Sequence, residues 1–304
     1  MHSKVNLTSL LVMLCMALML AVWTFAHNNA LLSDFSLPIN LVSVLPNSTD
    51  KNSTDPNERN GTSTRILCWI MTGSQYHSSR AQFVKQTWAK RCDKHMFMSD
   101  EENADLPAIN MNTSTGRHFL WQKTKRALSY LYEHYYDSYD WFLKADDDTY
   151  VIVENLRYFL NSMDANSPLY FGCHIRGLNG SPKQGYMSGG AGYVLSRTAL
   201  KKFVTEAMKD PNKCHVNGYS EDVEVGVCLE NVNVSTGDTR DEHKRHRFLP
   251  ISLEKVLVWK ENDAQAQWFQ GYAVHQIKKP KQLKQNTWRC SSQRSVDTHM
   301  CRWA

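Results

Sequence analysis

The chain has 304 residues, of which 42% are apolar, and its formal net charge is +5 at pH 7. That length suits one medium-sized domain with attached segments rather than several domains. The mild positive charge, without a basic block interleaved with aromatic residues, argues against a nucleic-acid-binding protein.

The first segment predicts a membrane anchor. Residues 7–26 read "LTSLLVMLCMALMLAVWTFA" and carry no charge, and about twenty such residues can span a bilayer as a helix. Lys4 precedes this stretch and the first acidic residue after it is Asp34. We therefore expect residues 1–6 in the cytosol and the body of the chain in the lumen, in type II orientation. The alternative is a signal peptide cleaved after Ala26.

Residues 27–64 are rich in Asn, Ser, Thr and Asp. They offer little to bury, so we expect a flexible stem between the anchor and a folded domain. Three N-glycosylation sequons lie in this stem and three lie further along: Asn47, Asn52, Asn60, Asn112, Asn179 and Asn233. Such a cluster behind an anchor predicts a glycosylated luminal segment.

Seven of the eight cysteines follow the anchor segment, and their spacing does not match a structural zinc site. Disulfides in an oxidising lumen are the better account. Proximity in sequence favours three pairs, although spacing alone does not fix connectivity: Cys68–Cys92, Cys214–Cys228 and Cys290–Cys301. Cys173 is left over, either as a buried, inert thiol or as a link between two chains.

Beyond the stem, short apolar runs alternate with segments of helical periodicity. The expected strands are 65–73, 95–99, 140–145 and 168–173. The expected helices begin near Ala81, Leu120 and Val153. Strands that alternate with helices of this length predict an α/β domain with a largely parallel sheet. We place this domain at residues 65–250.

Three adjacent carboxylates, Asp146 to Asp148, follow the expected strand 140–145. Ligands of open α/β sheets bind at the carboxyl ends of the strands. Neighbouring carboxylates supply hard oxygen ligands for Mg²⁺ or Mn²⁺, which can share its coordination with a nucleotide diphosphate. The alternative is an acidic turn in which Asp148 caps the next helix, but a cap needs only one Asp.

Two further stretches are candidates for the same site. "KQGYMSGGAGYVLS" at 183–196 holds glycines that let the main chain approach a ligand closely. "SEDVEVGVCL" at 220–229 begins with Glu221 and Asp222, which alternatively serve only as favourable charges at a helix N-terminus.

Seven segments in this order resemble one enzyme family: "RILCWIMTG", "VKQTWAKRC", "WFLKADDDTYV", "NLRYFL", "YFG", "KQGYMSGGAGYVLS" and "EDVEVGVC". The resemblance is to the core 1 β1,3-galactosyltransferases, also called T-synthases, within the wider β1,3-glycosyltransferase group that includes Fringe. It covers roughly residues 65 to 240.

The resemblance implies a GT-A fold in a type II Golgi membrane protein. It further implies transfer of galactose from UDP-galactose, with Mn²⁺, to O3 of the GalNAc on serine or threonine of glycoproteins. Under it, Asp146 and Asp148 hold the metal with Asp147 in support, and Asp222 is the base with Glu221 beside it. The remaining implied contacts to the nucleotide sugar are Thr72, Gly73, Asp146, Asp147, Tyr186, Gly189, Gly190 and Gly192.

The resemblance ends in the C-terminal segment, residues 251–304. Family members have a late histidine that completes the metal shell, and His275 is the nearest substitute by context, with His299 as another. This divergence leaves open an inactive paralogue that acts as a T-synthase-type chaperone or binds glycans, and a transferase that uses another UDP-sugar. A homodimer is also left open. The intact acidic triplet favours the active enzyme.

Overall fold

The structure is a computed structural model that describes residues 64–177, 179, 181–252, 255–256 and 262–276, and the backbone of 288–290 and 301–303. No helix in this part combines the length and apolarity needed to cross a membrane. The predicted anchor at 7–26, and the predicted stem except for Thr64, lie outside the described residues.

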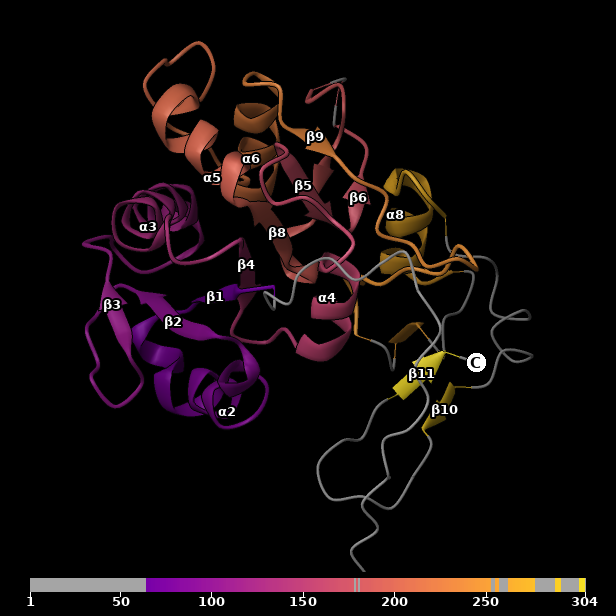
Figure 1. Cartoon of the computed structure of the whole chain (residues 1–304), viewed down its shortest axis with the longest axis horizontal. Helices are drawn as coiled ribbons and strands as arrows, with labels where there is room; N and C mark the ends of the chain where they lie inside the picture. Colours follow the sequence, from indigo (N-terminus) through magenta and orange to yellow (C-terminus); the bar gives the residue numbers. More distant parts are fainter. Residues whose placement is uncertain are drawn as a thin grey trace, which may run out of the picture. The chain divides into compact units, whose positions relative to one another are not determined.

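The core of the domain is a seven-stranded, mostly parallel sheet (Figure 1). Its order is β3-β2-β1-β4-β8-β5-β9, and β8 runs antiparallel to both of its neighbours. The strands are β1 (Ile66–Met71), β2 (Lys94–Ser99), β3 (Ala108–Asn110), β4 (Trp141–Asp146), β5 (Leu169–Gly172), β8 (Tyr193–Ser196) and β9 (Ser235–Thr236). The prediction of an α/β domain with a largely parallel sheet is confirmed, and this arrangement is consistent with a GT-A-like fold.

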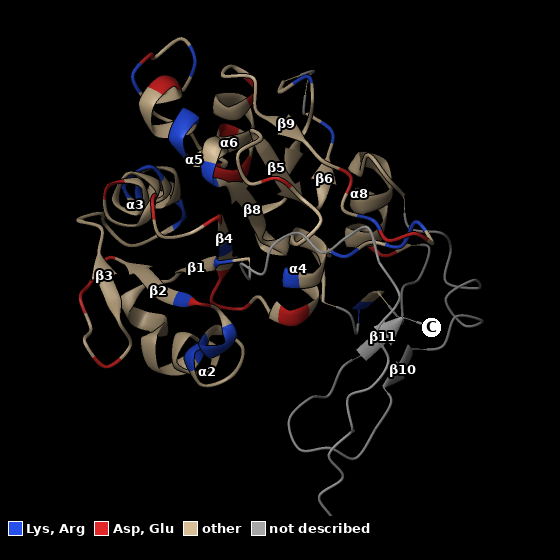
Figure 2. Cartoon of the chain, viewed as in Figure 1, with Lys and Arg blue, Asp and Glu red and all other residues tan. Residues whose placement is uncertain are grey.

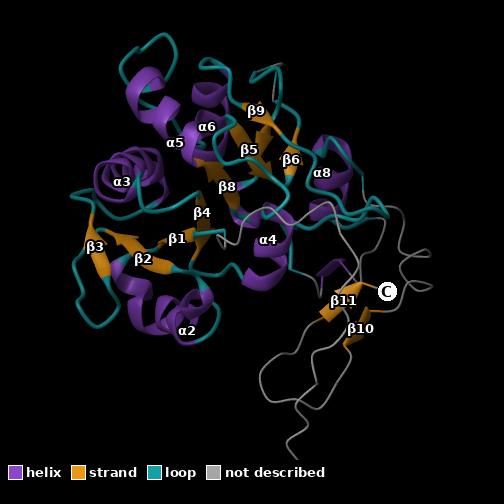
Figure 3. Ribbon diagram, in the orientation of Figure 1, coloured by secondary structure: helices purple, strands orange, loops and turns teal. Residues whose placement is uncertain are grey.

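Helices cover both faces of the sheet (Figure 3). One face packs against α3 (Leu120–Tyr135), α5 (Arg197–Lys202) and α6 (Glu221–Glu230). The other packs against α2 (Gln82–Gln86) and α4 (Val153–Leu160). The short helical turns are η1 (Ser74–Tyr76), η2 (His77–Ala81), η3 (Ala89–Arg91), η4 (Arg117–Phe119), η5 (Gly189–Ala191) and η6 (Phe203–Ala207).

Alternation along the central strands explains why both faces are apolar. In β4, Phe142 packs in the cluster under α3 and α6, whereas Trp141 and Leu143 pack in the cluster on the α2 and α4 face. Successive side chains of a strand point to opposite faces, so Lys144 and Asp146 share the face of Phe142. A lysine therefore stands on a core-facing position of a central strand.

A small hairpin extends the domain beside the sheet. It consists of β6 (His174–Ile175) and β7 (Tyr186–Met187), and α8 (Ala264–Tyr272) packs on it through Phe269. Two further strands, β10 (Trp288–Cys290) and β11 (Cys301–Trp303), pair with Cys290 opposite Cys301. The side chains of these two strands are not described, so that disulfide stays a prediction.

Two predicted disulfides are confirmed. Cys68 in β1 is bonded to Cys92, and Cys214 is bonded to Cys228 in α6. Cys173 has a free thiol and is buried. Of the two alternatives for this residue, the structure thus agrees with the buried thiol. Burial raises the pKa of this thiol to about 12, which keeps it protonated and unreactive.

Two predicted elements differ from the structure. The helix expected from Ala81 to Trp88 divides into η2, with π-helical geometry, and α2, which ends at Gln86. The glycine-rich stretch 183–196 forms not only a loop but also β7, η5 and the central strand β8. The apolar part of β8, Tyr193 to Leu195, is too short to be recognised beside three glycines.

Candidate active site

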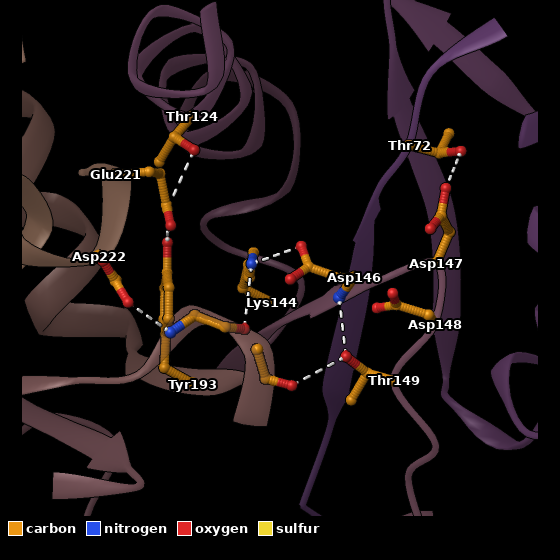
Figure 4. Close-up of polar contacts among 12 residues, drawn as sticks. Thr72, Thr124, Lys144, Asp146, Asp147, Asp148, Thr149, Tyr193, Glu221 and Asp222 are labelled. Carbon is orange, nitrogen blue, oxygen red and sulfur yellow. Dashed lines mark hydrogen bonds and ion pairs between the residues drawn. The ribbon is translucent and has the colours of Figure 1, made fainter. Parts of the chain in front are cut away.

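The acidic triplet occupies the carboxyl end of β4 and the turn that follows (Figure 4). Asp146 and Asp148 are partly open to solvent, with side chains 32% and 66% exposed, but Asp147 is only 7% exposed. The hydroxyl of Thr72, at the end of β1, donates a hydrogen bond of 2.7 Å to Asp147. Burial raises the pKa of Asp147. Asp147 thus fastens the turn to β1, which leaves Asp146 and Asp148 available for a ligand.

Two cations already face the triplet. Lys144 Nζ lies 2.6 Å from Asp146 Oδ1. Arg80 Nη1 lies 3.5 Å from Asp147 and 3.4 Å from Asp148, and its guanidinium also stacks over the ring of Tyr76. These ion pairs relieve the mutual repulsion of the three carboxylates.

Glu221 and Asp222 begin α6 and point to different surroundings. Glu221 is buried and accepts hydrogen bonds from the Tyr193 hydroxyl at 2.7 Å and the Thr124 hydroxyl at 3.0 Å. Burial raises the pKa of Glu221, against the opposing effect of the Lys144 charge. Asp222 is half-buried and accepts a 2.9 Å hydrogen bond from the Gly189 amide. Glu221 therefore anchors α6 to its neighbours, and Asp222 is the more accessible carboxylate.

The glycine-rich turn η5 lies between these two acidic groups. The Gly189 amide binds Asp222, and the Gly189 carbonyl accepts a 3.1 Å hydrogen bond from Lys144. The Gly190 carbonyl accepts a hydrogen bond from Thr149, next to the triplet. The three stretches selected from the sequence thus meet at one place, and Figure 2 shows acidic segments at the end of β4 and the start of α6.

Tyr186 lies on β7 beneath α6. Its side chain is buried, and burial, with the nearby charge of Asp222, raises its pKa to about 12. A β-carbon added at Gly226 of α6 would lie 2.6 Å from the Tyr186 β-carbon, so the helix packs closely on the strand. Tyr186 is therefore held near Asp222 as a neutral phenol.

A second buried cation lies at the end of β1, next to Thr72 and Gly73. Lys123 donates a 2.9 Å hydrogen bond to the Thr72 carbonyl and lies 3.8 Å from Asp100. Burial lowers the pKa of Lys123. Asp100 also accepts a 2.9 Å hydrogen bond from the Ser74 amide. Although Lys123 is charged, it lies on the buried side of α3, with its side chain only 5% exposed.

His275 contacts residues outside the acidic triplet. Its Nε2 lies 3.9 Å from Asp238, and its ring lies 6.4 Å from that of His174. Among the described residues, no hydrogen bond or ion pair joins His275 to Asp146 or Asp148, and no group of three His, Cys, Asp or Glu side chains is arranged to hold a metal. The metal-ligand role of His275 stays a prediction, and His299 lies outside the described residues.

Sequence reasoning missed the three cations Lys144, Lys123 and Arg80. A usable signal exists only for Lys144. It interrupts the apolar run "WFLKA", at the register position of a core residue. A charge at such a position is rarely retained without a partner.

Comparison with known proteins agrees with this geometry. The family model described as Fringe-like matches residues 62–285. The chain belongs to the Fringe-like family. In this Fringe-like chain, the matched range includes all the described site residues, from Thr72 to His275.

Several curated proteins are similar to this Fringe-like chain. Glycoprotein-N-acetylgalactosamine 3-beta-galactosyltransferase 1 of Xenopus laevis is 43% identical over 213 residues, which are 70% of this chain and 58% of the relative. Human chondroitin sulfate synthase 3 is 32% identical over 53% of this chain and 20% of its own length. Mouse beta-1,3-glucosyltransferase is 26% identical over 56% of this chain and 34% of its own. The chain thus spans less than two thirds of each of these relatives.

Proposed function

We propose that the chain is an inverting glycosyltransferase that moves galactose from UDP-galactose to O3 of GalNAc attached to serine or threonine. One observation carries the proposal. Lys144 and Gly189 lie between two acidic groups, the aspartates at the end of β4 (Asp146 and Asp148, here the strand-end aspartates) and Asp222 of α6. A donor diphosphate on one side and an acceptor hydroxyl on the other need such a separation of acidic groups. The 43% identity to the frog galactosyltransferase supports the choice of donor and acceptor.

Asp222 is the proposed general base. It would take the proton from O3 of the acceptor as that oxygen attacks the anomeric carbon, and UDP would leave from the opposite face, so that the configuration inverts. Help of this kind is worth about 10²–10⁴-fold in rate. Glu221 is less suited to the role because two hydroxyl groups already bind its Oε1.

The residues fit a divalent cation. Asp146 and Asp148 offer oxygen ligands that are open to solvent, and Mg²⁺-type ions are commonly held by one or two carboxylates together with substrate phosphates. We propose these two residues as the Mn²⁺ ligands of the donor site. When bound, the ion supplies Lewis-acid stabilisation of the charge on the departing diphosphate.

We also propose that the chain is a type II Golgi membrane protein with its catalytic domain in the lumen. The uncharged segment 7–26 after Lys4 supports the orientation. The two disulfides support an oxidising compartment.

The test is a donor screen with the purified chain. We expect transfer from UDP-galactose to a GalNAc-bearing peptide in the presence of Mn²⁺. Asp146→Asn and Asp148→Asn should abolish transfer, and Asp222→Asn should lower kcat by about 10²–10⁴-fold while UDP still binds. Asp137→Asn, at an exposed position, is the matched control and should behave like the wild type.

A second candidate is a catalytically inactive chaperone for a related transferase, which is favoured by the loss of the core 1 resemblance in residues 251–304, although the Fringe-like match continues to residue 285. It predicts no turnover with any UDP-sugar, together with tight binding to the unfolded related enzyme. Transfer of another sugar would retain the enzyme class but contradict the assigned donor.

A further inference from the structure

Lys144 is a buried cation in a central strand. Its side chain is 3% exposed, and a buried ammonium is unfavourable unless it is paired, so its partners define its role. The lysine lies among three carboxylates of the candidate site, those of Asp146, Glu221 and Asp222.

The contacts of Lys144 form a continuous path across the site (Figure 4). Its ammonium binds Asp146 at 2.6 Å on one side and the Gly189 carbonyl at 3.1 Å on the other. The amide of the same glycine binds Asp222 at 2.9 Å. Lys144 thus joins β4 to η5 directly, and the backbone of Gly189 extends the link to Asp222 of α6.

Gly189 has little freedom to move within this path. A β-carbon added there would lie 3.2 Å from Glu221 Oε2 and 3.4 Å from Lys144 Nζ. The turn therefore rests directly against the lysine and the start of α6. Without the lysine, the Gly189 carbonyl would lose its hydrogen bond. Because the Gly189 amide binds Asp222, movement of this residue would also displace Asp222.

We propose that Lys144 is a positioning residue that sets the place of Asp222 through Gly189 and couples it to Asp146. The proposal rests on the proposed function, because it assigns a purpose to the geometry of the same site. Lys144 itself exchanges no proton and touches no substrate. Through Gly189, Lys144 fixes the distance between Asp222, the proposed general base, and Asp146 at the end of β4.

The first test compares Lys144→Met with Lys144→Arg. Misplacement of a catalytic group by about 1 Å can cost 100-fold in rate. We expect Lys144→Met to lower kcat by about 100-fold, with little change in the acceptor KM or in the affinity for UDP measured by calorimetry. Lys144→Arg, which keeps the charge, should recover part of the kcat. Lys123→Met is the matched buried-lysine control, and its location at Thr72 predicts an effect on UDP affinity rather than on kcat.

The second test does not depend on turnover. Hydrogen exchange of the Gly189 amide, followed by NMR, should be about tenfold faster or more in Lys144→Met, because the bond to a charged group is weakened. Amides of β1 should be unchanged and serve as the internal control for folding. If Lys144→Met does not fold, Gly189→Ala displaces the same turn and should give the same loss of kcat.

Three results would overturn the proposal: a kcat within about threefold of the wild type, an unchanged Gly189 exchange rate, or a parallel loss of UDP affinity and kcat. A wild-type chain that transfers no sugar would refute the proposed function instead. In that case the Gly189 exchange rate still decides whether Lys144 holds Asp222.

Discussion

Gly190 and Gly192 of the glycine-rich turn have different steric surroundings. Gly192 has φ +74°, and a β-carbon there would lie 2.8 Å from the Lys144 carbonyl oxygen. At Gly190 the nearest atom to such a β-carbon is the Pro250 carbonyl oxygen, at 3.7 Å. The family resemblance implies the same sugar-binding role for both, but only Gly192 is required by the backbone.

We expect Gly192→Ala to lower the free energy of unfolding by about 1–3 kcal/mol, because it adds a positive-φ penalty to a clash with the backbone of β4. Gly190→Ala should change it by less than about 0.5 kcal/mol. Urea denaturation of both variants measures the difference. Equal stability of the two variants would contradict this account of the turn.

At the scale of elements, the contact between α8 and the loop before it contains a half-buried histidine, His246. The ring of His246 lies 5.6 Å from that of Phe269 in α8, and its Nε2 is a buried atom without a hydrogen-bond partner in the described part of the chain. Burial lowers the pKa of His246 to about 4, and the charge of His275 acts in the same direction. The packing of α8 therefore requires the neutral imidazole.

The sign of the pH effect follows from the lowered pKa. The stability that depends on neutral His246 is fully present above the ordinary pKa of about 6.5 and is lost as the pH falls toward 4. Between pH 7 and pH 4.5 we expect a loss of about 2–3 kcal/mol in the free energy of unfolding. His246→Leu, which cannot be protonated, should remove that part of the pH dependence in urea titrations. An identical pH dependence in the variant would show that other groups cause it.

The long periodic elements could be predicted, and the short ones could not. The expected starts of α3 and α4, at Leu120 and Val153, match the structure because their apolar spacing extends over two turns or more. β8 was missed because its three apolar residues follow directly after glycines, where a loop is equally expected. Its antiparallel direction depends on sheet pairing that no local pattern contains.

At the scale of the whole molecule, two disulfides close loops of the chain, one between neighbouring strands and one onto a helix. Cys68–Cys92 closes a loop with a separation of 24 residues between β1 and the start of β2, and Cys214–Cys228 closes one of 14 residues onto α6. Loops of this size restrict the unfolded chain by about 3 kcal/mol each. The second disulfide also ties down the helix that carries Asp222.

Replacing both Cys214 and Cys228 by Ala should therefore lower the free energy of unfolding by about 3 kcal/mol. The Cys68→Ala, Cys92→Ala pair should cost a similar amount, and each effect should disappear when the wild type is measured in a reductant. Chemical denaturation with and without reductant gives the comparison. No difference between oxidised and reduced wild type would show that the disulfides do not support the fold.

The acidic members of the candidate site could be chosen from sequence, and Lys144 leaves a signal by interrupting an apolar run, whereas Arg80 and Lys123 leave none. Asp146, Asp148 and Asp222 stand in motifs with a recognisable chemistry. Arg80 approaches the triplet only because η2 lies next to the end of β4, and Lys123 is buried only because α3 covers the end of β1. Contacts between residues distant in the chain depend on the finished fold and leave no local pattern.

The buried thiol of Cys173 has one practical consequence. It lies in the same small cluster as Phe269 and Ile175, so a maleimide can reach it only when α8 separates from the hairpin. The rate at which this thiol is alkylated therefore measures how often this part of the domain opens spontaneously. Measured with and without a sugar nucleotide, that rate would reveal whether donor binding slows the opening of the hairpin that carries Tyr186.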